Sequence, residues 1–150
     1  MPRETEPTTV LSERLRDVFD RHVMNYGAYN LVYTTGIEHR AESPMTPTLA
    51  EDSGHFIVGY RRAPSEIVIV PMDTNRMQAI GVPVAIDNTN LVQAAASSSD
   101  SFSLETTSGA VFDLKVSPLS EVDTPHGTEI LEQEADREDF LDYIREISAF

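Results

Sequence analysis

The sequence predicts an α+β fold: an antiparallel sheet of six to seven strands with an amphipathic helix near each end of the chain. Two pairs of apolar runs are each joined by a short turn, which is typical of hairpins. Helical stripes occur mainly near the two ends, so strands do not alternate with long helices, and a parallel doubly wound sheet is disfavoured. A single domain over residues 1–150 accommodates this pattern, with residues 1–9 expected to be disordered.

The first helix is predicted over Val10–Tyr26, because apolar residues recur there every three or four positions. This stripe consists of Leu11, Leu15, Val18, Phe19, Val23 and Tyr26. The expected N-terminal cap is Thr8, Thr9 or Ser12, and Gly27 is the expected stop. We expect this helix to lie on the sheet.

The first strand is predicted over Asn30–Thr35, ending at Gly36. Residues 37–54 are polar, contain two prolines and show neither period, so they predict a long loop. The clearest hairpin follows. Its strands are His55–Tyr60 and Ile67–Val70, in which β-branched and aromatic residues predominate, and residues 61–66 form its turn.

The middle of the chain gives weaker signals. Met77–Ile86 is apolar but contains Gly81 and Pro83, which predicts an irregular edge strand. Residues 87–90 form a turn cluster, and Leu91–Ala96 is interpreted as a short helix.

A second hairpin is predicted from Phe102–Thr106 and Val111–Val116, with a turn at residues 107–109. Strict alternation cannot place Val111 and Phe112 on one face, so one of them is expected to point outward. Residues 117–127 are expected to form a loop.

The carboxyl-terminal part combines one ambiguous segment with one clear helix. Thr128–Ala135 fits either a strand or the first turns of a helix. A helix is predicted from Asp136, which can cap it, because apolar residues then recur along one stripe.

Two architectures fit this order of elements. If Thr128–Ala135 is the last strand and the final helix plugs a small barrel, the arrangement is similar to pleckstrin-homology-like (PH-like) domains. If Leu91–Ala96 is a middle helix, the α-β-β-β-α-β-β-α order is similar to that of secretion chaperones. Both are similarities of element order, and neither depends on a diagnostic motif.

Composition excludes several classes of function. With 25 acidic and 11 basic residues the formal net charge is −14, which repels phosphate backbones and argues against nucleic-acid binding. The absence of cysteine excludes disulfides and thiolate metal sites. No stretch is apolar enough for a membrane span, and the first nine residues lack an apolar leader, so a cytoplasmic location is expected.

The candidate ligand-binding residues lie around the predicted long loop. His39 and His55 flank it, and Asp52 lies within it, so two imidazoles and a carboxylate are available for zinc or manganese. No histidine pair has the i, i+4 spacing of a helical zinc motif, so we assign no metal and no cofactor. Arg61 and Arg62, the only adjacent basic pair, are candidates for gripping a carboxylate or phosphate.

No segment places a nucleophile, a base and an orienting group together, so no catalytic residue is assigned and a non-enzymatic function is favoured. Residues 121–146 contain ten acidic and two basic side chains, and such a surface can steer a basic partner toward the last helix. The candidate interaction face is the stripe of that helix: Phe140, Leu141, Ile144 and Ile147.

The favoured function is therefore a non-catalytic protein-binding module, acting through self-association or a basic partner. A small enzyme or ligand carrier with a pocket under residues 37–54 is the second hypothesis. A lipid-binding PH-like domain is the third, and it requires basic residues clustered at one end of the barrel.

Overall fold

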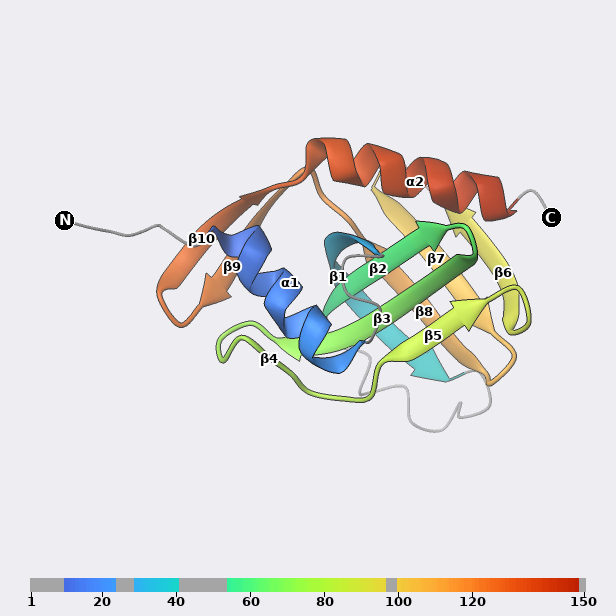
Figure 1. Ribbon diagram of the computed structural model, residues 1–150, viewed down its shortest axis with the longest axis horizontal. Helices are drawn as coiled ribbons and strands as arrows, with labels where there is room; N and C mark the ends of the chain where they lie inside the picture. The colour runs from blue at the N-terminus through green and yellow to red at the C-terminus, as the bar shows by residue number, and fades with distance from the viewer. Residues whose placement is uncertain (1–9, 24–28, 41–53, 97–99, 149–150) are drawn as a thin grey trace.

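The structure, a computed structural model, describes residues 10–23, 29–40, 54–96 and 100–148. Its elements in chain order are α1 (Leu11–His22), β1 (Asn30–Arg40), β2 (Gly54–Arg62), β3 (Ser65–Asp73), β4 (Gln78–Ala79), β5 (Val84–Asp87), β6 (Leu91–Ala96), β7 (Ser101–Thr106), β8 (Ala110–Lys115), β9 (Leu119–Thr124), β10 (Gly127–Glu132) and α2 (Glu134–Ser148). The predicted α+β class, with an antiparallel sheet and a helix near each end, is confirmed (Figure 1).

The main sheet has the strand order β4-β3-β2-β1-β8-β7-β6, and β5 pairs with β3 beside β4. Strand β1 joins the two halves, because its first part pairs with β2 and its last part with β8. The sheet ends in β4 and β5 on one side and in β6 on the other, so it is open. The barrel alternative is therefore wrong.

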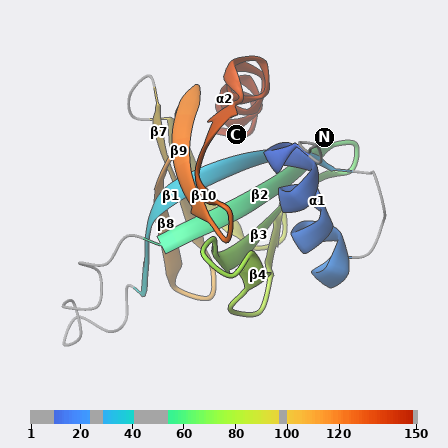
Figure 2. The same cartoon turned by 90° about the vertical axis from the view of Figure 1, so that its left-hand side faces the viewer.

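The two helices cover opposite faces of the main sheet (Figure 2). Along β2, Ile57 packs in the cluster on the α1 side, whereas Phe56 and Val58 pack in the cluster on the α2 side, as strand alternation requires. A Cβ atom at Gly59 would lie 2.4 Å from the ring of Phe19. This glycine therefore lets α1 approach the sheet closely.

The first helix is shorter than predicted. It begins at Leu11 with Val10 as its N-cap, and no side chain caps it, so the expected cap at Thr8, Thr9 or Ser12 is wrong. It ends at His22, and Val23 is its C-cap. Residues 24–28, with the expected stop at Gly27, lie outside the described residues, as do residues 1–9.

Strand β1 continues through Gly36 to Arg40, so the predicted loop does not begin at residue 37. A Cβ atom at Gly36 would lie 2.2 Å from the carbonyl oxygen of Asp113. Glycine here permits the close approach of β1 to β8 and is not a terminator. Residues 41–53, including Asp52, lie outside the described residues.

Both predicted hairpins are confirmed. The first is longer than predicted, with β2 and β3 in register from the His55 and Met72 pair to the Arg62 and Ser65 pair. In the second, Phe112 is fully buried and Val111 is only partly buried, so Val111 is the residue that points outward. Gly81 and Pro83 divide the predicted irregular edge strand into β4 and β5.

The prediction of a helix at Leu91–Ala96 is wrong, because this segment is strand β6 paired with β7. The register shifts between Leu91 and Gln93, so Val92 is a bulge. Leu91 and Ala94 therefore both pack in the cluster on the α2 side although they are three residues apart, a spacing that resembles a helix turn. This result also excludes the secretion-chaperone order.

Residues 119–124 form β9, so the predicted loop at 117–127 is wrong. The ambiguous segment Thr128–Ala135 contains both predicted structures, because it is strand β10 as far as Glu132 and helix α2 from Glu134. Strands β9 and β10 form a separate two-stranded sheet near α1. Helix α2 begins at Glu134, two residues before the predicted start at Asp136. Gln133 therefore occupies the N-cap position that was predicted for Asp136. Its carbonyl accepts the backbone N–H of Arg137 (2.8 Å).

Neither helix of the described part of the chain is long and apolar enough to cross a membrane.

Candidate functional site

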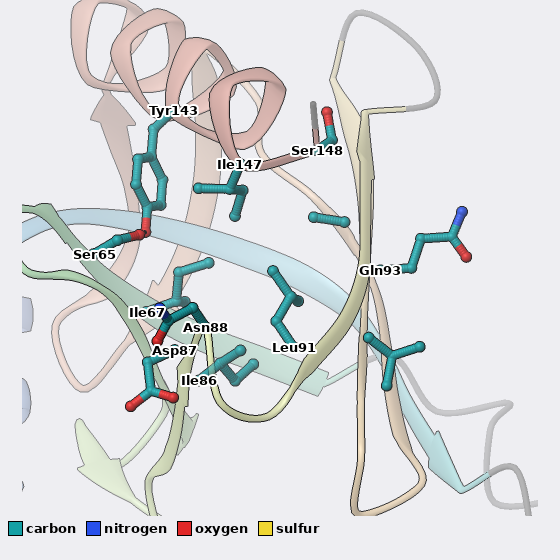
Figure 3. A pocket seen from close by; sticks show the side chains of 12 residues that line it. Ser65, Ile67, Ile86, Asp87, Asn88, Leu91, Gln93, Tyr143, Ile147 and Ser148 are labelled. Atoms are coloured by element: carbon teal, nitrogen blue, oxygen red, sulfur yellow. The ribbon is translucent and has the colours of Figure 1, made fainter. Parts of the chain in front are cut away.

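A cavity of about 630 Å³ lies between the carboxyl-terminal half of α2, the β3–β5 edge of the sheet and β6 (Figure 3). Its lining is mostly apolar and comes from β3, β5, β6, α2 and the turn between β5 and β6. The lining residues are Ser65, Ile67, Ile86, Asp87, Asn88, Leu91, Val92, Gln93, Ala94, Tyr143, Ile147 and Ser148. We call this space the α2–β6 cavity.

The β5–β6 turn at residues 88–90, of which Asn88 lines the cavity, is held by hydrogen bonds to Asp87. The Asp87 carboxylate accepts hydrogen bonds from the Thr89 backbone N–H (2.9 Å) and the Thr89 hydroxyl (2.5 Å). These bonds form an Asx turn, which directs the chain from β5 to β6. The two strands belong to opposite edges of the main sheet, so the turn bridges the gap between the edges.

A hydroxyl pair lies at the α2 side of the cavity. The Ser65 Oγ and the Tyr143 OH are 2.6 Å apart, and the Tyr143 ring stacks on the Tyr60 ring at 5.3 Å between centroids. Burial raises the pKa of Tyr143, so its hydroxyl is protonated at neutral pH. This pair offers a ligand hydrogen bonds and no negative charge.

Asp87 is the only charged side chain among the described residues that line the cavity. Hydrogen bonds from Thr89 lower its pKa, so it carries a negative charge at neutral pH. In Figure 3 its carboxylate points away from the Tyr143 hydroxyl. The lining therefore brings together no nucleophile and general base, and the arrangement is suited to binding apolar groups.

The structure does not bring His39 and His55 together. His55 is opposite Thr35 on β1, and His39 lies four residues farther along that strand, roughly 13 Å away. The His55 Nδ1 is hydrogen-bonded to the Tyr33 hydroxyl (2.6 Å), and the His39 Nε2 pairs with the Asp113 carboxylate (2.9 Å). Among the described residues, no three histidine or carboxylate side chains could together hold a metal ion.

The Tyr33 hydroxyl that contacts His55 is strongly held in its neutral form. Burial, followed by the negative charge of Asp123, raises the pKa of Tyr33 to about 12. His55 and Tyr33 are also stacked, with 6.0 Å between ring centroids. They form a local pair on the α1 side of the sheet.

Arg61 and Arg62 are both engaged by carboxylates of the chain itself. Arg61 pairs with Glu66 (3.0 Å) and lies over the Tyr29 ring. Arg62 pairs with Asp139 (3.1 Å) and Glu146 (3.2 Å) on α2. The arginine pair thus ties the β2–β3 hairpin to the last helix and the Tyr29 region.

The apolar stripe of α2 is mostly part of the core. Phe140, Leu141 and Ile144 are buried against the sheet. Ile147 is partly buried and lines the α2–β6 cavity. It is the one member of the predicted interaction face that a partner could reach in this part of the structure.

Apart from Ile147, the residues that line the α2–β6 cavity are not among the site residues that the sequence predicts. Leu91 and Ala94 were placed in a helix, and Ile86 was placed in an irregular edge strand without a site. The available signal was the Asn88–Asn90 turn, which separates two short apolar runs as a strand-turn-strand unit does.

The Asp139 carboxylate on α2 gives a pH-dependent contribution to stability. Hydrogen bonds from the Arg62 guanidinium and then from the Tyr60 hydroxyl (2.5 Å) lower its pKa. A carboxyl group with a lower pKa in the folded state stabilises the fold above its unfolded pKa. That contribution is lost as the pH falls through the folded value.

We therefore expect the free energy of unfolding to decrease as the pH falls from about 5, and to decrease less in the Asp139→Asn variant. Urea denaturation of both proteins at a series of pH values measures this difference. Equal pH dependence in the two proteins would contradict the assignment.

No protein-family model matches this chain, and comparison with curated proteins and with solved structures gave no significant match.

Proposed function

We propose that this chain is a non-catalytic binding module that takes up the apolar part of another protein in the α2–β6 cavity. The observation that supports this proposal is the cavity itself: it measures about 630 Å³, its lining is mostly apolar, and a single one of the described lining residues is charged. Binding pockets in proteins typically have this size and this mixture of apolar walls and few polar groups.

The polar groups of the cavity fit a binding function better than catalysis. The Ser65 and Tyr143 hydroxyls form one pair, and the Asp87 carboxylate accepts hydrogen bonds from Thr89 in the β5–β6 turn. A ligand in the cavity thus meets hydroxyl and amide groups that can orient it. It meets no imidazole, thiol or lysine among the described lining residues.

A phosphate-bearing lipid is a less suitable ligand. No basic side chain lines the cavity among the described residues, and the adjacent arginine pair is bonded to Glu66, Asp139 and Glu146. A carrier whose pocket lies under residues 37–54 involves positions outside the described residues, so the α2–β6 cavity is the site that we propose.

A neutral apolar dye such as Nile red tests access to the cavity. We expect the Ala94→Phe variant to bind it at least about tenfold more weakly, because the added ring would fill the cavity that Ala94 lines. Ala95→Phe is the matched control: Ala95 is the next residue of β6, faces the other side and does not line the cavity. Dye fluorescence titrations measure both affinities.

Thermal unfolding of both variants establishes that they remain folded. Strong dye binding by Ala94→Phe, or equal loss in the two folded variants, would contradict the cavity as the binding site.

A further inference from the structure

The α2–β6 cavity opens between two strands that are adjacent in sequence but unpaired. Strand β5 pairs with β3, and β6 pairs with β7. From the turn at residues 88–90 the two strands diverge, as Figure 3 shows, and apolar side chains of both strands face the space between them. The main sheet is thus interrupted between β5 and β6, and the α2–β6 cavity lies at this interruption.

The free edge of β5 is already occupied by a side chain. The Asn90 amide donates to the carbonyl of Ala85 (2.9 Å) and accepts the backbone N–H of Asp87 (2.8 Å). One amide therefore satisfies the two backbone groups that a neighbouring strand would use. A strand entering the gap cannot pair with β5 at these positions unless it displaces Asn90.

The outer edge of β6, which faces away from β7, has no side chain hydrogen-bonded to its backbone in the described part of the chain. Among the described strands β6 pairs with β7 alone, so about half of its backbone N–H and C=O groups point away from the sheet. No hydrogen bond between described residues reaches those outward groups in Gln93–Ala96. The side chains at positions 94–96 are only methyl groups, and helix α2 packs against β6 on the cavity side.

The side chains beside this edge suit an extended ligand with alternating apolar residues. Ile67, Ile86 and Leu91 lie in the cavity below Tyr143 and Ile147 (Figure 3). In a strand added to β6, every second side chain would point into that space and the others would point to solvent. Backbone pairing and apolar burial would then act on the same ligand.

The charge of the surroundings indicates what should flank the apolar residues. Helix α2 carries six acidic and two basic residues, and Asp87 is the only charged residue among the described residues that line the cavity. The whole chain has a net charge of −14. A ligand with lysine or arginine at its ends is therefore attracted to this site, whereas an acidic one is repelled.

We propose that an extended segment of another protein, with apolar side chains at alternate positions and basic flanks, adds to the outer edge of β6 as a new strand. This inference rests on the proposed function, because the added strand uses the same cavity. It goes further by fixing the conformation of the ligand, the strand that pairs with it and its charge.

The first test is selection of peptides from a displayed random library of about ten residues, enough to span a strand the length of β6. The full chain is the target. We expect the selected peptides to carry apolar residues at i, i+2 and i+4 with lysine or arginine outside them. Apolar residues at i, i+3 and i+4 would indicate a helical ligand and overturn the proposal.

The second test uses backbone N-methylation of one selected peptide, one position at a time. We expect methylation at alternate positions to weaken binding roughly tenfold, because each removes a hydrogen bond to β6, and methylation at the positions between them to have little effect. Equal sensitivity at every position, or none, would overturn strand addition. Replacing the basic flanks by glutamine should weaken binding and reduce its dependence on salt.

Different results would contradict the proposed binding function and the proposed strand addition. If Nile red binds and Ala94→Phe blocks it while no alternating peptide is selected, the cavity is a binding site and strand addition is wrong. If neither the dye nor a peptide binds the folded chain, the proposed function itself is wrong.

Discussion

The Phe140→Ala variant is expected to lose about 3 to 5 kcal/mol of unfolding free energy, the usual cost of removing a buried phenylalanine ring. Phe140 is completely buried on the side of α2 that packs against the sheet. Its ring lies 4.8 Å from the Phe102 ring on β7 and 5.1 Å from the Tyr60 ring on β2, measured between centroids. One side chain therefore joins the last helix to strands from both halves of the main sheet.

Urea denaturation followed by circular dichroism measures this loss. Glu138→Ala is the matched control on the same helix, because Glu138 is exposed and its removal should change stability by no more than about 0.5 kcal/mol. A loss below about 1 kcal/mol for Phe140→Ala would contradict the packing of α2 on the sheet.

The Gln133→Met variant is expected to cost about 2 to 4 kcal/mol. The Gln133 amide accepts the backbone N–H of Tyr33 (2.9 Å) and donates to the carbonyls of Tyr33 (2.9 Å) and Ser117 (2.9 Å). The described Tyr33 backbone has no strand neighbour on this side, because β8 pairs with β1 only from Thr35 onward. Methionine keeps the volume but leaves these backbone groups without partners.

Gln78→Met is the control for this substitution, because Gln78 is exposed on the edge strand β4. Its unfolding free energy should stay within about 0.5 kcal/mol of the unchanged chain. If both methionine variants have the same stability, Gln133 does not serve as a substitute strand partner for β1.

Much of the fold was predictable because local chemistry and tertiary pairing agree there. The hairpin around Ala63 and Pro64 combines β-branched runs with a turn residue, and both helices carry their apolar stripes at the expected spacing. These elements needed no long-range information.

The failures have local physical causes. The bulge at Val92 gives Leu91 and Ala94 a helix-like spacing in a strand. Pro118 and Pro125 flank β9, so the sequence of this segment resembles that of a loop. Gly36 was interpreted as a stop, although its missing Cβ is what lets β1 continue beside β8.

The candidate site was the least predictable part. It is formed by β3, β5, β6 and α2, which come together only because the open sheet curves under the last helix (Figure 1). No local pattern marks such a space. The roles of Asn90 and Gln133, whose side-chain amides pair with strand backbones, likewise depend on contacts that a sequence pattern does not show.

The most direct test of the account is a titration of the ¹⁵N-labelled chain with a selected peptide, followed by amide chemical shifts. We predict that the largest shifts occur in β6, in the turn at residues 88–90 and near Ile147, with smaller shifts at His39 and His55. The largest shifts around His39 and His55, with none along β6, would contradict binding in the α2–β6 cavity.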